Sequence, residues 1–204
     1  MKRILCFGDS NTYGFRPHIG GRYEPDVRWT GILAERLFPY GYKIIEGGIN
    51  GMTTVFDDDK SPDRNGSSVI LRMLRENDPV DAVMIMLGTN DCKTKFAADA
   101  DMITEGMEVL VSMIRAFSPD IRIMIIAPAE ITGSVLFEDG DFDKSSIEKS
   151  RLLKEKYAGL ARRTDCTFFC AGDVVRADPS DGVHLSAESH RLLAEELFRV
   201  IVPE

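Results

Sequence analysis

The chain has 204 residues, a formal net charge of −8 and 44% hydrophobic residues. This length is typical of one domain, and we expect a single domain over residues 1–204. The acidic balance argues against a broad grip on nucleic acid or on an anionic membrane, and the composition is that of a folded globular chain. No apolar run approaches the ~18 residues needed to span a bilayer, which predicts a cytoplasmic protein without a membrane segment.

Apolar runs of strand length recur along the chain, with amphipathic helical patterns between them. The runs lie at residues 4–7, 43–45, 82–87, 121–127 and 167–169. The helical patterns cover residues 29–38, 69–74, 107–114, 147–160 and 192–200. The third and fourth runs are almost continuously apolar, as in parallel strands that helices cover on both faces. The alternation predicts an α/β fold, a three-layer α/β/α sandwich around a five-stranded parallel sheet with right-handed crossovers.

Ligands of such sheets bind in loops beyond the carboxyl ends of the strands. The loops expected there cover residues 8–14, 47–54, 88–94, 128–143 and 171–184. Another segment, 56–67, is polar and turn-rich and is expected to be a solvated loop. Its acidic triplet at 57–59 lacks the alternating ligand spacing of a calcium loop. We therefore expect no metal site in this segment.

The cysteines are expected to be free thiols that pack in the interior. They are Cys6, Cys92, Cys166 and Cys170, and they include no C-x-x-C pair. A chain of this length needs no disulfide framework for its stability, and free cysteine is among the most buried residue types.

Ser10 follows the first predicted strand in the sequence Gly8-Asp9-Ser10-Asn11. This places a hydroxyl on a tight turn at the sheet edge where ligands bind, although a serine there is also typical of a helix cap or a turn. As a nucleophile, Ser10 would need a base, and an imidazole can accept its proton near neutral pH. The chain offers three histidines for that role.

His184 is the strongest candidate base because Asp181 precedes it in a loop before the last predicted helix. One turn can bring the Asp181 carboxylate to Nδ1 of the imidazole and leave Nε2 for Ser10. A capping or turn arrangement of the same pair is the alternative. His18 is expected in a surface loop, and His190 on the polar side of the last helix.

An acyl-transfer site also needs preplaced donors that stabilise a negative oxygen. Asn90 follows the third predicted strand and can aim its amide into the same cleft. Gly48, after the second strand, can bring a backbone N–H close because no side chain stands in the way. The backbone N–H of Ser10 is the third candidate. Taken separately, the segments around Asn90 and Gly48 are also typical of ordinary turns.

In this combination the residues resemble the SGNH hydrolases, the superfamily of GDSL esterases and lipases. The matching blocks are residues 8–11, Gly48, residues 88–91 and residues 181–184. One departure is Asn11, because leucine commonly follows the serine in this family. The resemblance implies a flavodoxin-like SGNH hydrolase fold in which Ser10 is the nucleophile and His184 and Asp181 complete a triad. It also implies that the three donors named above form the oxyanion hole.

A closer resemblance is to small bacterial aryl esterases of this superfamily that also transfer acyl groups to alcohols. It rests on residues 2–10, 25–31 and 85–91. It implies that Tyr13 and Phe15 flank the acyl or alcohol site, and we add Asp9 and Asn11 to the expected substrate-binding residues. Those relatives form oligomers, so a homo-oligomer is expected here as well. The 128–143 loop is shorter than its counterpart, which makes acyl transfer in water a weaker expectation than hydrolysis.

We therefore predict a serine esterase that hydrolyses short-chain carboxylic esters of small molecules, without a cofactor or a metal ion. Short acyl chains are expected because the sequence shows no large apolar lid. A carbohydrate O-acetyl esterase with the same machinery is the alternative enzyme. From another class, a flavin- or phosphate-binding module would use the loop after the first strand, but it leaves Asn90 and the pair of Asp181 and His184 unexplained. An inactive scaffold with the same fold is the remaining alternative.

Overall fold

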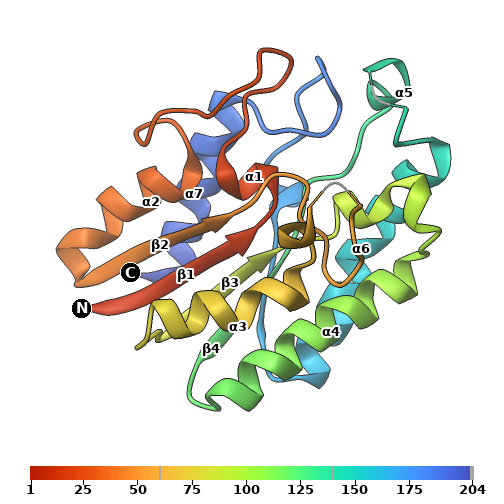
Figure 1. Cartoon of the computed structure of the whole chain (residues 1–204). Coiled ribbons are helices and arrows are strands. Elements are labelled where there is room, and N and C mark those ends of the chain that lie inside the picture. The colour runs from red at the N-terminus through yellow and green to blue at the C-terminus, as the bar shows by residue number, and fades with distance from the viewer. Residues whose placement is uncertain (60, 139, 203–204) are drawn as a thin grey trace.

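The computed structural model describes residues 1–59, 61–138 and 140–202, in which strands and helices alternate along the chain (Figure 1). The strands are β1 (Lys2–Gly8), β2 (Tyr42–Gly48), β3 (Ala82–Met86), β4 (Arg122–Ala127) and β5 (Thr167–Cys170). The helices are α1 (Ser10–Tyr13), α2 (Trp29–Leu37), α3 (Gly66–Glu76), α4 (Ala100–Phe117), α5 (Val135–Glu138), α6 (Lys144–Arg163) and α7 (Ala187–Ile201). Short 3₁₀ turns cover Phe38–Tyr40, Pro62–Arg64, Asn90–Cys92, Thr94–Phe96 and Ala171–Asp173. The predicted strands and long helices are confirmed, with ends that differ by up to seven residues, the most at the start of α4.

All paired strands are parallel, in the order β2-β1-β3-β4-β5. This is the strand order of a flavodoxin-like sheet, as predicted. The chain first builds outward from β1 to β2 and then continues on the other side of β1 with β3, so the strand order reverses between these elements. Gly8 and Met86 are register partners at the carboxyl ends of β1 and β3. A ligand crevice is expected beside them, because open α/β sheets bind ligands at such a switch point.

Successive strand residues enter two separate cores. On β1, Leu5 and Phe7 belong to the core shared with α3, α4 and α6, whereas Ile4 and Cys6 belong to the core shared with α2 and α7. Figure 1 shows these two helical layers on opposite sides of the sheet. Burial on both faces explains why β3 is apolar at every position. Within the described part of the chain, no helix has both the length and the apolar character needed to cross a membrane.

The segment 56–67 departs from the predicted solvated loop, because it contains a buried carboxylate. Asp58 is 6% exposed and pairs with Arg64 and Lys95, each at 3.1 Å. Lys95 comes from a distant part of the chain, so local composition could not reveal this contact. Residue 60 of the segment lies outside the described residues.

The cysteines are all free, as predicted. Cys6, Cys92 and Cys170 are buried, and Cys166 is partly buried just before β5. Burial raises the pKa of the Cys92 thiol to about 12, which leaves it protonated and unreactive at neutral pH. These thiols are packing residues.

Candidate active site

Ser10 is the first residue of α1, directly beyond the carboxyl end of β1. The Asp9 side chain caps this helix by accepting a hydrogen bond from the Asn11 N–H at 2.9 Å. Gly8 has to be glycine, because a Cβ atom there would lie 2.2 Å from Thr12 Oγ1. The backbone N–H of Ser10 has no acceptor among the described residues, as is usual for the first N–H groups of a helix. The Ser10 hydroxyl therefore stands at the switch point with a free backbone donor beside it.

The structure brings the predicted nucleophile, base and orienting acid together. His184 Nε2 lies 2.9 Å from Ser10 Oγ, and His184 Nδ1 lies 2.7 Å from Asp181 Oδ2. The other carboxylate oxygen, Oδ1, accepts the backbone N–H groups of Val183 and His184, both at 2.9 Å. The expected turn between Asp181 and His184 is therefore present, and it folds the carboxylate onto both the backbone and the imidazole.

These three side chains are shielded from water but remain accessible from one side. Ser10 is 6% exposed, and the side chains of His184 and Asp181 are 20% and 16% exposed. Burial raises the pKa of Asp181, but the hydrogen bonds from His184 and from the backbone outweigh it and hold this pKa below its usual value. Asp181 is therefore a carboxylate at neutral pH and accepts the Nδ1–H of the imidazole. Nε2 is then free to accept the Ser10 proton.

A pocket of about 480 Å³ opens over these side chains. It is lined by Ser10, Phe15, Asn50, Gly51, Arg64, Asn90, Lys93, Asp141, Phe142, Asp181, Val183 and His184. Asn90 enters the pocket from the loop after β3, and its Nδ2 donates a hydrogen bond to Met52 O at 3.1 Å. This bond orients the amide and leaves its second N–H for a ligand.

Gly48 does not line this pocket, which corrects its predicted place in the site. It packs against α1, where a Cβ atom would lie 2.2 Å from Tyr13 N. Gly51 of the same loop lines the pocket instead, with a φ of +81° that favours glycine. The Gly51 N–H has no acceptor among the described residues. Gly48 is glycine for packing, and Gly51 is the glycine that can serve a ligand.

The loops that carry Asn90 and Gly51 are tied together by a buried carboxylate. Asp91 Oδ1 accepts the backbone N–H of Thr54 at 2.9 Å and the Thr54 hydroxyl at 2.5 Å. Burial raises the pKa of Asp91 to about 6. The contact fixes the two donor loops relative to each other.

Among the predicted substrate-binding residues, Phe15 lines the pocket and the others do not. Asp9 and Asn11 are 1% and 3% exposed, and their side chains bond to the protein backbone. Burial raises the pKa of Asp9 to about 6. The Tyr13 ring turns toward Arg22, whose guanidinium carbon lies 4.6 Å from the ring centroid. Nearness to Ser10 in the chain did not reveal these directions, because side chains point to different sides within one helical turn.

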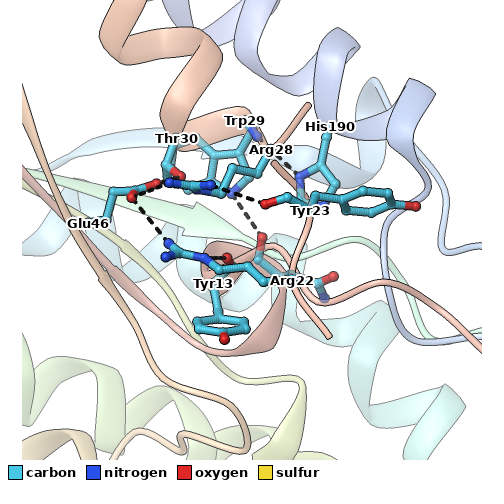
Figure 2. A network of polar contacts seen from close by, with 9 residues as sticks. Tyr13, Arg22, Tyr23, Arg28, Trp29, Thr30, Glu46 and His190 are labelled. Atoms are coloured by element: carbon cyan, nitrogen blue, oxygen red, sulfur yellow. Dashed lines mark hydrogen bonds and ion pairs between the residues drawn. The ribbon is translucent and has the colours of Figure 1, made fainter. Parts of the chain in front are cut away.

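The long loop after α1, residues 14–28, is anchored to the edge of the sheet by the polar network in Figure 2. Glu46 on β2 accepts hydrogen bonds from Arg28 Nε at 2.6 Å, from Arg22 at 3.1 Å and from the Thr30 hydroxyl. Burial raises the pKa of Glu46, but the bonds from Arg28 and Thr30 hold it below its usual value. The loop that supplies one wall of the pocket is therefore held by a charged contact.

His190 is fully buried, which corrects its predicted place on the polar side of α7. Its Nδ1 accepts the Trp29 N–H at 3.3 Å, and the Tyr23 ring packs against it with centroids 5.4 Å apart (Figure 2). Burial lowers the pKa of His190 to about 3, so the ring stays neutral. His18 is exposed in its loop, as predicted.

The charged rim of the pocket was not predicted. Lys93 Nζ pairs with Asp141 Oδ2 at 3.1 Å and lies 5.3 Å from the Phe142 ring centroid. The Arg64 side chain lies over Gly51, within 3.0 Å of the position that a Cβ atom would take. These residues come from three different loops, and no local pattern marks any of them. Only the fold brings them to one pocket.

A hydroxyl, an imidazole and a carboxylate in line at the carboxyl edge of a flavodoxin-like sheet are the arrangement of a serine hydrolase. In the part of the chain that the structure describes, no group of three His, Cys, Asp or Glu side chains could hold a metal ion. The model of the GDSL-like lipase/acylhydrolase family matches residues 6–192, and the chain belongs to this family. It is a carboxylic ester hydrolase of the SGNH type.

Several solved structures are similar over nearly the whole chain. The aryl esterase of M. smegmatis is 34% identical with a TM-score of 0.90, and the match covers 98% of each chain. Est24, a carbohydrate acetylesterase from Sinorhizobium meliloti, is 36% identical with a TM-score of 0.92, again over 98% of each chain. A putative arylesterase from Agrobacterium tumefaciens str. C58 is 34% identical with a TM-score of 0.91 over 98% of each chain. No curated protein gave a significant match.

Proposed function

We propose that the chain hydrolyses short-chain carboxylic esters through an acyl-enzyme on Ser10. Ser10 Oγ attacks the ester carbonyl while His184 Nε2 takes its proton, and His184 then gives that proton to the leaving alcohol. Water repeats the sequence and releases the acid. Asp181 holds the imidazole in the tautomer with Nδ1 protonated and stabilises the imidazolium that forms. The alignment of Ser10, His184 and Asp181 at 2.9 and 2.7 Å is the observation that carries this proposal.

Three donors are available for the negative oxygen of the tetrahedral intermediate. They are the backbone N–H of Ser10, the backbone N–H of Gly51 and the second Nδ2–H of Asn90. The two backbone groups have no acceptor among the described residues, and the amide of Asn90 is oriented by its bond to Met52. Donors that are in place before the reaction stabilise developing charge without reorganisation. Gly51 replaces Gly48 in this role.

The alcohol half of the substrate would contact the rim of the pocket. Polar groups lie there beside the aromatic ring of Phe142, on the side chains of Asn50, Arg64, Lys93 and Asp141. Mixed polar groups beside an aromatic ring suit an alcohol with several hydroxyls, such as a sugar. The likeness to a carbohydrate acetylesterase supports this second candidate, and the likeness to an aryl esterase supports a simple or aryl ester.

Transfer of the acyl group to an alcohol would use the same acyl-enzyme, with the alcohol in place of water. It stays a prediction. So do the cytoplasmic location, the homo-oligomer and the absence of a nucleic-acid partner.

A panel of esters tests the proposal. Nitrophenyl esters from acetate to long-chain acyl groups are assayed beside acetylated sugars, with Ser10→Ala as the control. We expect hydrolysis that is fastest with short acyl chains and is lost in Ser10→Ala. Full activity in Ser10→Ala would overturn the proposal, and a preference for long chains would overturn the acyl assignment.

A pair of lysine variants separates the two alcohol classes. If the rim binds a sugar, Lys93→Gln should lower kcat/KM for an acetylated sugar and leave kcat/KM for nitrophenyl acetate nearly unchanged. Lys156→Gln is the matched control, because Lys156 also forms an ion pair, with Asp101, away from the pocket. Equal effects of Lys93→Gln on both substrates would favour the simple ester.

A further inference from the structure

We propose that Asn11 is a positioning residue that sets His184 against Ser10. Its side-chain amide bonds to the residues on either side of the histidine. Nδ2 donates to Val183 O at 3.2 Å, and Oδ1 accepts the Leu185 N–H at 2.9 Å. Asn11 directly follows Ser10, so one side chain joins the neighbour of the nucleophile to both neighbours of the base. This inference rests on the proposed function of Ser10 and His184.

The amide is matched to the loop in a way that an apolar side chain cannot reproduce. Asn11 is 3% exposed, and Val183 and Leu185 are 8% and 1% exposed. An asparagine side chain has a donor and an acceptor with the same spacing as a peptide group, so it can pair with a carbonyl and an N–H that flank one residue. Without it, a buried carbonyl and a buried N–H would lose their partners, which drives the loop to move.

Asn11 is itself held from the opposite side. Trp29 Nε1 donates to the backbone carbonyl of Asn11 at 3.0 Å, and the Trp29 N–H donates to Nδ1 of the buried His190. Figure 2 shows Trp29 and His190 joined in this way. This series of hydrogen bonds therefore extends from α7 through α2 to α1, which carries Ser10. A support built from buried, hydrogen-bonded residues keeps the amide in one orientation.

Two backbone hydrogen bonds of the loop that carries His184 do not involve α1. Asp178 N–H donates to His184 O at 2.7 Å, and Thr132 N–H donates to Gly182 O at 2.9 Å. These bonds shape the loop and tie it to the segment after β4. The two bonds from Asn11 join the loop directly to α1. Together with the packing of the Phe15 ring against His184, they set the 2.9 Å separation between Ser10 Oγ and His184 Nε2.

The test replaces Asn11 with leucine, which is common at this position in the family and fills similar space without polar atoms. Because misplacing a catalytic group by about 1 Å can cost ~100-fold, we expect Asn11→Leu to lower kcat by ~10–100-fold with KM within about twofold. The rate constant for inactivation by a fluorophosphonate should fall by the same factor, since that reaction needs the same proton transfer to His184. Asn11→Asp keeps the acceptor for the Leu185 N–H, so its kcat should lie between that of the unmodified chain and that of Asn11→Leu.

Controls separate positioning from stability and from substrate binding. Ile114→Ala empties a fully buried site on α4 and should lower Tm without lowering kcat at temperatures where the protein is folded. An unchanged kcat in folded Asn11→Leu would overturn the inference while leaving the role of Ser10 intact. A rise in KM with unchanged kcat would also overturn it and would indicate that Asn11 binds the substrate. Activity of Ser10→Ala would instead overturn the proposed function itself.

A measurement on the unmodified chain covers the case in which Asn11→Leu does not fold. The Leu185 amide donates to the buried Asn11 side chain, so its hydrogen exchange, followed by NMR, should be slowed at least ~100-fold relative to an unprotected peptide amide. Exchange at the unprotected rate would show that the hydrogen bond from the Leu185 N–H to Asn11 is not formed in solution, and it would overturn the inference.

Discussion

The ring of Phe15 packs against the imidazole of His184, with centroids 4.5 Å apart and planes inclined by 40°. The loop that follows the candidate nucleophile therefore also supplies the pocket wall beside the candidate base. Tyr13, two residues earlier, faces Arg22 and does not line the pocket.

Phe15 and Tyr13 should respond differently to truncation. Phe15→Ala removes a pocket wall and should widen the range of acyl or alcohol groups accepted, measured as kcat/KM across the nitrophenyl ester series. Tyr13→Ala should leave that profile unchanged and act only on Tm. A widened profile in Tyr13→Ala, together with an unchanged one in Phe15→Ala, would contradict the pocket described here.

Asn90→Ala removes one of the three proposed oxyanion donors. We expect kcat to fall by ~100–1000-fold with a small change in KM, because the bond would form with the transition state and not with the bound ester. Steady-state kinetics on nitrophenyl acetate measures both constants. If KM rose and kcat held, Asn90 would be a ground-state binding residue.

Asp181→Asn tests the orienting acid. The variant can still accept the backbone N–H groups of Val183 and His184 through its carbonyl oxygen, so the turn and the fold should persist. The NH2 group of the new side chain then faces His184 Nδ1 and donates to it, which leaves the imidazole in the wrong tautomer, with its proton on Nε2. We expect kcat to fall by ~100–10,000-fold with circular dichroism unchanged. Full activity would reduce the site to a Ser10–His184 dyad.

The buried His190 should couple the free energy of unfolding to pH. Its pKa is about 3 in the folded chain and 6.5 as a model value, so below pH 6.5 the unfolded chain takes up a proton that the folded chain does not. The contribution of His190 to the free energy of unfolding therefore falls as pH falls, by about 2 kcal/mol between pH 8 and pH 5.

His190→Asn isolates this term. The difference in unfolding free energy between the two chains, measured by denaturant titration, should shrink by about 2 kcal/mol over the same pH range. Asp9 and Asp91, whose pKa values burial raises to about 6, titrate in both chains and cancel in the difference. If this difference in unfolding free energy were the same at pH 8 and at pH 5, His190 would not be buried in the folded chain.

Local sequence patterns were sufficient to predict the parallel sheet and the hydrogen-bonded arrangement of Ser10, His184 and Asp181. Continuous apolar runs mark strands covered on both faces, and the edge of a parallel sheet collects the loops that follow them. The spacing of Asp181 and His184 allowed one turn to join them, and the structure contains that turn. Such features depend on neighbours in the chain and so can be read from the sequence.

Residue directions and long-range contacts could not be predicted in the same way. Gly48 and Gly51 differ in what approaches them, and that depends on α1 and on Arg64. Asn11 reads as a polar residue beside the nucleophile, although its partners lie 172 and 174 residues away. His190 is polar in a helix whose other residues gave no sign that this position faces Trp29. In each case tertiary packing decides the role.

Covalent labelling shows whether Ser10 is the nucleophile. The folded chain is treated with a fluorophosphonate, digested, and analysed by mass spectrometry beside Ser10→Ala and His184→Ala. We predict one covalent adduct, on Ser10, formed in step with the loss of esterase activity, absent in Ser10→Ala and strongly slowed in His184→Ala. An adduct on another residue, or full esterase activity in a chain that carries the adduct on Ser10, would show that Ser10 is not the nucleophile.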